Sequence, residues 1–219
     1  CHPLTVLDDH SRFALGLQTC ANELGVTVQE RLTAIFGRYG LPERMLMDNG
    51  SPWGFDQDHP YTPLTVWLLR LGISVSHGRP YHPQTQGKDE RFHRTIAAEV
   101  LQGRSFTDLA HCQKAFDHWR DIYNLERPHE ALDLLTPASK YEVSDRPFPE
   151  TLPDLEYGPG DLVRRVHEKG RISVFGRIFK IGKAFRGMKV ALRPTATDGV
   201  WDVFFSTHAI AQLDLRQDA

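Results

Sequence analysis

Two acidic residues of this chain stand where a carboxylate could bind a metal ion. Glu90 falls in the first turn of an expected helix that starts near Lys88, beside a loop of glycine, proline and polar residues. The positive end of a helix dipole favours a carboxylate there, and such a place suits a metal site that must open to a large substrate. Asp48 ends a short apolar stretch and precedes Asn49-Gly50. Sites in α/β sheets commonly lie at strand ends, although the motif taken alone is better explained as a plain Asp-Asn-Gly turn.

The helix that would position Glu90 is indicated by its apolar spacing. Phe92, Ile96 and Val100 recur every four residues, which predicts one buried face. The preceding residues 78–87 contain two prolines and two glycines, so we expect a loop there.

Strands and helices alternate through residues 1–140, which predicts an α/β domain. The expected strands cover 3–7, 13–19, 44–47 and 73–77, and the expected helices cover 25–40, 62–71, 88–101 and 106–125. The first two strands form a hairpin with Asp8-Asp9-His10-Ser11 in or near its turn.

The pattern changes after residue 140. Residues 141–156 contain three prolines and five acidic residues, which is typical of a linker. Residues 157–219 contain short apolar runs separated by glycines, and this predicts a small antiparallel β-barrel. The runs cover 162–163, 172–175, 178–181, 190–192, 200–205 and 210–213.

The composition is that of an ordinary globular protein, with 219 residues of which 40% are hydrophobic and 25% charged. No apolar run is long enough for a membrane span, and the first residues do not form a signal peptide. Three scattered cysteines favour reduced thiols in the cytoplasm. The net charge of −2 says little, but residues 157–219 contain eleven lysines and arginines against six acidic residues. That balance fits phosphate contact or, equally well, a solvated basic surface.

The stretch PYHPQTQGKDE, residues 80–90, closely resembles a motif of retroviral-type integrases and of the related transposases of bacterial insertion sequences. The family pattern is aromatic-x-Pro-Gln-(Ser/Thr)-x-Gly-x-x-Glu, and it makes Glu90 the catalytic glutamate. Residues 47–51, MDNGS, resemble the second acidic motif of the same family, so Asp48 becomes a second catalytic residue. The 41 residues between Asp48 and Glu90 exceed the usual family spacing, which suggests a loop insertion.

The resemblance implies a ribonuclease-H-like integrase core over residues 1–140, followed by an SH3-like barrel over 157–219. It also implies Mg²⁺ or Mn²⁺ held by Asp48 and Glu90, because oxygen ligands suit these ions. Phosphoryl transfer commonly uses two metal ions about 3.5–4 Å apart, so a third carboxylate is expected. In the family that residue lies on a first strand absent from this sequence. Asp8 and Asp9 are the nearby substitutes, but they are better explained as turn residues of the hairpin.

Several polar residues around this motif are candidates for DNA contact, with ordinary polar loop or solvated helix positions as the alternative. They are His82, Gln84, Gln86, Lys88, Arg91 and Arg94. Arg127 and His129, in a segment resembling the end of the family's core, are weaker candidates. The barrel implies further binding of DNA or of other subunits.

The resemblance implies a metal-dependent DNA transposase that acts as a homo-multimer on paired DNA ends, in the cytoplasm and without a membrane partner. The alternative is a catalytically incomplete fragment that binds DNA or other subunits. Another nuclease of the ribonuclease-H fold, such as an RNA–DNA hybrid hydrolase, fits the fold but not the barrel or the motif at 80–90.

Overall fold

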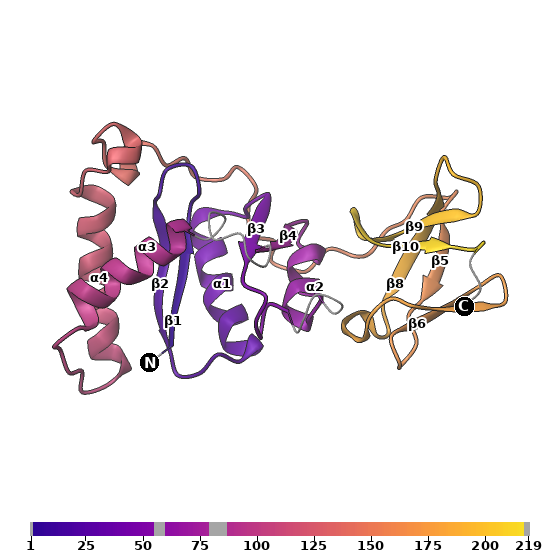
Figure 1. The fold of residues 1–219 in the computed structure, drawn as a ribbon, viewed down its shortest axis with the longest axis horizontal. Helices are drawn as coiled ribbons and strands as arrows, with labels where there is room; N and C mark the ends of the chain where they lie inside the picture. The colour runs from indigo at the N-terminus through magenta and orange to yellow at the C-terminus, as the bar shows by residue number, and fades with distance from the viewer. Residues whose placement is uncertain (1, 55–59, 79–86, 217–219) are drawn as a thin grey trace. The chain divides into compact units, whose positions relative to one another are not determined.

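The computed structural model describes residues 2–54, 60–78 and 87–216. The chain divides into two compact units, each made of two stretches of sequence (Figure 1). The first unit contains Cys1–Leu41 and Gly78–Phe148, and the second contains Pro42–His77 and Pro149–Ala219.

A β-hairpin covered by helices forms the first unit. Strand β1 (His2–Leu7) pairs with β2 (Ala14–Cys20) in antiparallel register. Helix α1 (Gly25–Tyr39) packs on one side of β2, while α3 (Gly87–Ile96) and α4 (Leu109–Leu125) lie on the other (Figure 1). A π-helical turn, Ala97–Leu101, continues α3, and two short 3-10 turns, Glu130–Leu132 and Pro137–Ser139, follow α4.

The two faces of β2 explain this layering. Leu17 is fully buried in a core that it shares with Phe92, Ile96 and Phe116. The neighbouring Gly16 lies against α1, where a Cβ atom would collide with the side chain of Ile35. The expected buried stripe of α3 is therefore confirmed.

Side chains of α4 also bind the backbone of β2. The Asn124 amide oxygen accepts the Ala14 N–H at 2.8 Å, and its nitrogen donates to the Ala14 carbonyl at 3.1 Å. Gln113 accepts the Thr19 N–H at 2.7 Å and donates to the Leu17 carbonyl at 3.0 Å. These bonds satisfy main-chain groups that an exposed strand edge would leave open.

The second unit begins with a strand–helix–strand arrangement. Strand β3 (Arg44–Met47) runs parallel to β4 (Ser74–His77), and α2 (Pro63–Arg70) joins them. Thr62 caps α2, because its hydroxyl accepts the Thr65 N–H at 3.2 Å.

The rest of the second unit is a small antiparallel β domain, as expected. Its four-stranded sheet has the order β10-β9-β8-β5, and the β6-β7 hairpin is separate. The strands are β5 (Leu162–Arg165), β6 (Arg171–Val174), β7 (Arg177–Lys180), β8 (Lys189–Pro194), β9 (Val200–Phe205) and β10 (His208–Asp214), with a 3-10 turn at Lys183–Phe185. Ile172, Phe185 and Phe205 are fully buried in its core, to which Val66 and Leu69 of α2 contribute.

The segment expected to be a linker, 141–156, contains no helix or strand but part of it is packed. The Leu41 N–H donates to the Arg146 carbonyl at 2.7 Å, and the Ser144 hydroxyl donates to the Leu41 carbonyl at 2.7 Å. Tyr141 stacks on Phe13 with ring centroids 4.3 Å apart. These contacts fix residues 141–146 to Phe13 and to the end of α1, and the domain boundaries at 140 and 156 stay a prediction.

Candidate functional site

Asp48 directly follows β3. Met47, the last residue of that strand, pairs with His77 at the end of β4, so Asp48 lies at the carboxyl edge of two parallel strands. The expected turn is present, because the N–H groups of Trp53 and Gly54 donate to the Gly50 carbonyl at 2.9 and 3.0 Å. Asp48 is exposed, which leaves its carboxylate accessible to solvent.

Glu90 is exposed in the first turn of α3, as expected. The same helix buries Phe92 and Ile96 on its other side, so Glu90 points away from the core. No hydrogen bond or ion pair joins the Glu90 side chain to Arg94 or to any other residue that the structure describes. Its carboxylate is thus accessible to solvent at a helix N-terminus.

Asp48 belongs to the second unit and Glu90 to the first, and each is described within its own unit. Within the ranges 2–54, 60–78 and 87–216, no three His, Cys, Asp or Glu side chains are grouped to hold a metal ion. As single ligands, both carboxylates have the chemistry that Mg²⁺ or Mn²⁺ prefers. Their joint role as metal ligands stays a prediction.

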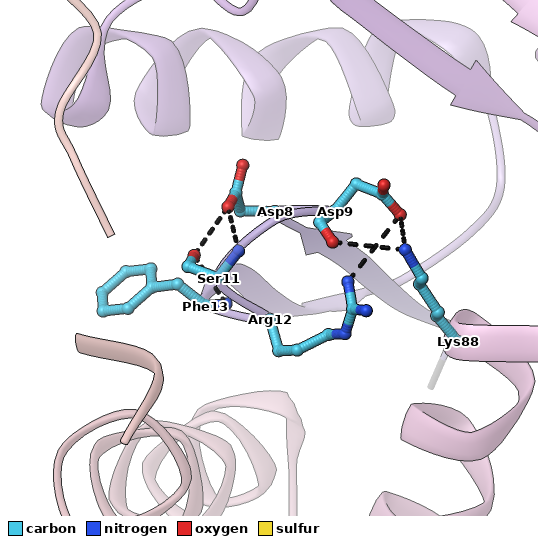
Figure 2. A network of polar contacts seen from close by, with 6 residues as sticks. All are labelled: Asp8, Asp9, Ser11, Arg12, Phe13 and Lys88. Atoms are coloured by element: carbon cyan, nitrogen blue, oxygen red, sulfur yellow. Dashed lines mark hydrogen bonds and ion pairs between the residues drawn. The ribbon is translucent and has the colours of Figure 1, made fainter. Parts of the chain in front are cut away.

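Asp8 is hydrogen-bonded within the hairpin turn, and Asp9 is paired with Arg12 of the turn and with Lys88 of α3, as Figure 2 shows. The Asp8 carboxylate accepts the Ser11 N–H at 2.7 Å and the Ser11 hydroxyl at 2.6 Å. Asp9 forms an ion pair with Lys88, and its carboxylate lies 3.9 Å from Nη1 of Arg12. The expectation that these acids are turn residues agrees with this network.

The predicted DNA-contacting residues differ in whether the structure describes them and in what they contact. His82, Gln84 and Gln86 lie outside the described residues. Lys88 donates hydrogen bonds to the Asp9 carboxylate and, at 3.3 Å, to the Asp9 carbonyl, so it connects α3 to the hairpin. Arg91 and Arg94 are exposed on α3.

A cavity of about 460 Å³ lies beside the start of α3, within the first unit. Four cationic side chains line it: Arg12, Lys88, Arg91 and Arg127. The sequence analysis identified Lys88, Arg91 and Arg127 as candidates for DNA contact but not Arg12. No sequence pattern indicates the backbone conformation that Arg12 adopts in the hairpin turn. Its φ of 62° is left-handed, a region that arginine seldom adopts.

Arg127 is held in place by a carboxylate and two aromatic rings. Glu99 Oε2 accepts hydrogen bonds from Arg127 at 2.5 Å and from the Trp119 indole N–H at 2.6 Å. The guanidinium carbon lies 5.6 Å from the Trp119 ring centroid and 6.0 Å from that of Tyr123. The bond from Arg127, aided by that from Trp119 and opposed by burial, lowers the pKa of Glu99.

This lowered pKa makes the stability of the first unit pH-dependent. Ionised Glu99 stabilises the fold fully above the ordinary pKa of glutamate, and that contribution is lost as pH falls through the lower pKa of the folded state. We expect Glu99→Gln to lower the free energy of unfolding at neutral pH by about 1 kcal/mol, since the carboxylate is partly exposed. Urea unfolding of both proteins between pH 7 and pH 3 should show this difference shrinking with acidity. Glu126→Gln is the control, and an equal effect there would contradict the prediction.

Two stretches of the chain match protein-family models. Residues 71–137 match the integrase core domain, and residues 161–219 match the C-terminal domain of IS481 family transposases. The first match contains Glu90, α3 and α4, and the second contains all six strands of the β domain.

Curated relatives come from bacterial insertion elements. An uncharacterized 31.7 kDa protein of insertion element IS407 from Burkholderia multivorans is 27% identical over 135 residues, which cover 62% of this chain and 47% of that protein. An uncharacterized 39.2 kDa protein of insertion element IS476 from Xanthomonas euvesicatoria is also 27% identical over 135 residues, covering 62% and 37%. The chain thus spans half or less of the length of these relatives.

Solved structures of integrases are also similar. The catalytic core domain of BIV integrase has a TM-score of 0.46 and 23% identity, covering 62% of this chain and 81% of that one. An intasome of simian T-cell lymphotropic virus, solved with a PP2A regulatory subunit, has a TM-score of 0.46 and 15% identity, covering 94% and 72%. Within the described part of this chain, every helix is too short or too polar to cross a membrane.

Proposed function

Because the chain combines an integrase core domain with the C-terminal domain of an IS481-family transposase, we propose that it cuts and joins DNA strands in the transposition of a bacterial insertion sequence. The observation that carries this proposal is the presence of both domains in one chain, with Glu90 inside the matched core. Hydrolysis would free a 3′-hydroxyl on the element, and that hydroxyl would then attack a phosphodiester of the target DNA. The product is an integrated element.

In this proposal Asp48 and Glu90 are two of the metal ligands. Both are exposed carboxylates, one after a strand and one in the first turn of a helix, so DNA can reach them. Asp48 and Glu90 would hold Mg²⁺ or Mn²⁺, and a pair of such ions would supply activation of the attacking oxygen and stabilisation of the leaving oxygen. The carboxylates themselves hold negative charge near the scissile phosphate and fix where a cation can sit.

DNA is the proposed partner of both units, through phosphate contacts that carry no sequence information. In the first unit these contacts fall to the residues around the 80–90 motif, including Arg91 and Arg94. In the second unit the basic residues of the β domain would bind DNA or a further subunit. Joining two DNA ends requires a homo-multimer, and we place the reaction in the cytoplasm.

A second candidate function is DNA or subunit binding without catalysis. It is favoured by the hairpin turn, where Asp8 is bonded to Ser11 and Asp9 to Lys88. Both acids take part in contacts of the hairpin turn, whereas two-metal chemistry calls for a third carboxylate beside Asp48 and Glu90.

Isothermal titration calorimetry with Mn²⁺ and Mg²⁺ tests the proposed metal site. We expect the 219-residue chain to bind Mn²⁺, and both Asp48→Asn and Glu90→Gln to weaken that binding at least about tenfold, since each removes one charged ligand. Glu30→Gln, which removes an exposed carboxylate of α1, is the control. If the intact chain binds no metal, the non-catalytic function is the correct one.

A further inference from the structure

The cavity beside α3 has features that the carboxylate site does not explain. It is formed by the hairpin turn, the start of α3 and the end of α4 with the residues after it. On α3, Lys88, Arg91 and Thr95 face the cavity at three- and four-residue spacing. Glu90 and Arg94 do not line it, so the cavity and the proposed metal ligand occupy different faces of one helix.

Two buried nitrogen atoms at this cavity lack a hydrogen-bond partner among the described residues. They are Nη1 of Arg12 and Nε2 of His129, and both residues line the cavity. The Asp9 carboxylate lies 3.9 Å from Nη1 of Arg12, which is close enough for attraction but too far for a hydrogen bond. An arginine is always charged and can only donate. An oxygen-rich anion in the cavity would supply the missing acceptor.

The balance of charge points to the same kind of ligand. Among the described residues, Asp9 pairs with Lys88, Glu99 pairs with Arg127, and Glu130 is the acidic side chain that lines the cavity. Burial, followed by the charges of Arg127 and Arg12, lowers the pKa of His129, so its imidazole is neutral at pH 7. The cationic side chains that line the cavity outnumber the lining carboxylate of Glu130, which favours an anionic ligand.

Local backbone structure adds to this preference. Gly87 and Lys88 line the cavity at the N-terminus of α3, where main-chain N–H groups favour anions. Arg12 is held in its left-handed conformation by the hairpin turn, in which its N–H donates to the Asp8 carbonyl at 3.0 Å. An uncommon backbone conformation at a residue that lines a cavity fits a functional role.

We propose that this cavity binds one phosphate group of a DNA strand, with Arg12, Arg91 and Arg127 as the donors. The proposal rests on the proposed function for the identity of the nucleic acid. It adds a phosphate anchor on a different face of α3 from Glu90. The phosphate can belong to an internal phosphodiester or to a strand terminus, and the two sources are distinguished below.

Fluorescence anisotropy with a labelled duplex of mixed sequence tests the proposal. EDTA is present, so that metal binding makes no contribution. Arg12→Gly removes the guanidinium and suits a positive φ, while Arg91→Ala removes an exposed side chain. We expect each to weaken binding about 3- to 10-fold at low salt and to lower the slope of log K against log salt by about one. Arg31→Ala, exposed on α1 and away from the cavity, makes the same change in charge and should alter neither quantity.

A second set of DNA ligands distinguishes an internal phosphodiester from a terminal phosphate. The duplex is compared with its 5′-phosphorylated form, and deoxythymidine monophosphate is added as a competitor. Equal losses with both duplexes, and no competition, indicate an internal phosphodiester. A loss confined to the phosphorylated duplex, with competition by the nucleotide, indicates a terminal phosphate.

Three results would overturn the proposal: no DNA binding by the intact chain, wild-type binding by both cavity variants, or an equal loss in Arg31→Ala. Circular dichroism spectra verify that each variant is folded. If the phosphate site is contradicted but Asp48→Asn and Glu90→Gln still remove metal binding, the proposed metal-dependent function is retained. The two tests are separate because DNA binding in EDTA does not depend on those carboxylates.

Discussion

Glu90→Gln is expected to reduce metal-dependent DNA strand cleavage by at least about 1000-fold. The substitution removes the charge of a proposed metal ligand and keeps its size. Metal ions contribute several kcal/mol of transition-state stabilisation, and each 1.36 kcal/mol corresponds to about a tenfold change in rate. The fold should survive, because Glu90 is exposed and its loss costs about 0.3–1 kcal/mol of helix-dipole interaction.

Mn²⁺-dependent nicking of a supercoiled plasmid measures this effect without knowledge of the element's end sequences. Asp89→Asn is the matched control, since Asp89 lies in the same first turn and the variant makes the same change in charge. We expect Asp89→Asn to retain most of the activity. If both variants lose activity equally, the total negative charge of the turn matters rather than the Glu90 carboxylate. If the Glu90→Gln variant retains its nicking activity, Glu90 is not a metal ligand.

The elements around Glu90 could be predicted from the sequence because local patterns determine them. The four-residue spacing of Phe92, Ile96 and Val100 requires a helix that buries one face, and all three side chains are buried. In the β domain, glycines separate most of the expected strands. Gly170 adopts a φ of 71°, and a Cβ atom there would collide with the backbone at Gly182.

The cavity could not be predicted, because its residues come together only through tertiary packing. Arg12 lies in a hairpin turn and Arg127 follows α4, so they are distant in sequence although they line one cavity. The hydrogen bonds of Asn124 and Gln113 with β2 have the same origin. From the sequence alone, a polar helix residue that binds a neighbouring strand cannot be distinguished from one that faces solvent. Asp48 and Glu90 could be proposed as site residues because a sequence motif surrounds each of them, and that assignment stays a prediction.

The core between α4 and β2 sets the position of both the cavity and α3, so Phe116→Ala should strongly destabilise the first unit. Phe116 is fully buried among Leu17, Phe92 and Ile96. Truncating a buried phenylalanine to alanine costs about 3–5 kcal/mol, because apolar contacts are lost and a cavity remains. We expect the midpoint of thermal unfolding to fall by roughly 10 °C.

Amide hydrogen exchange locates the effect as well as measuring it. Protection of the amides in α4 and β2 should fall in Phe116→Ala, since exchange reports the local free energy of opening. Phe175→Ala is the matched control, because Phe175 is 62% exposed in the β domain and its truncation should cost about 1 kcal/mol or less. Equal loss of protection in both variants would mean that α4 and β2 are not stabilised mainly by this core. Selective loss in Phe116→Ala would show that the packing of this one aromatic ring stabilises α4 and β2, the elements from which the hairpin turn and Arg127 extend to the cavity.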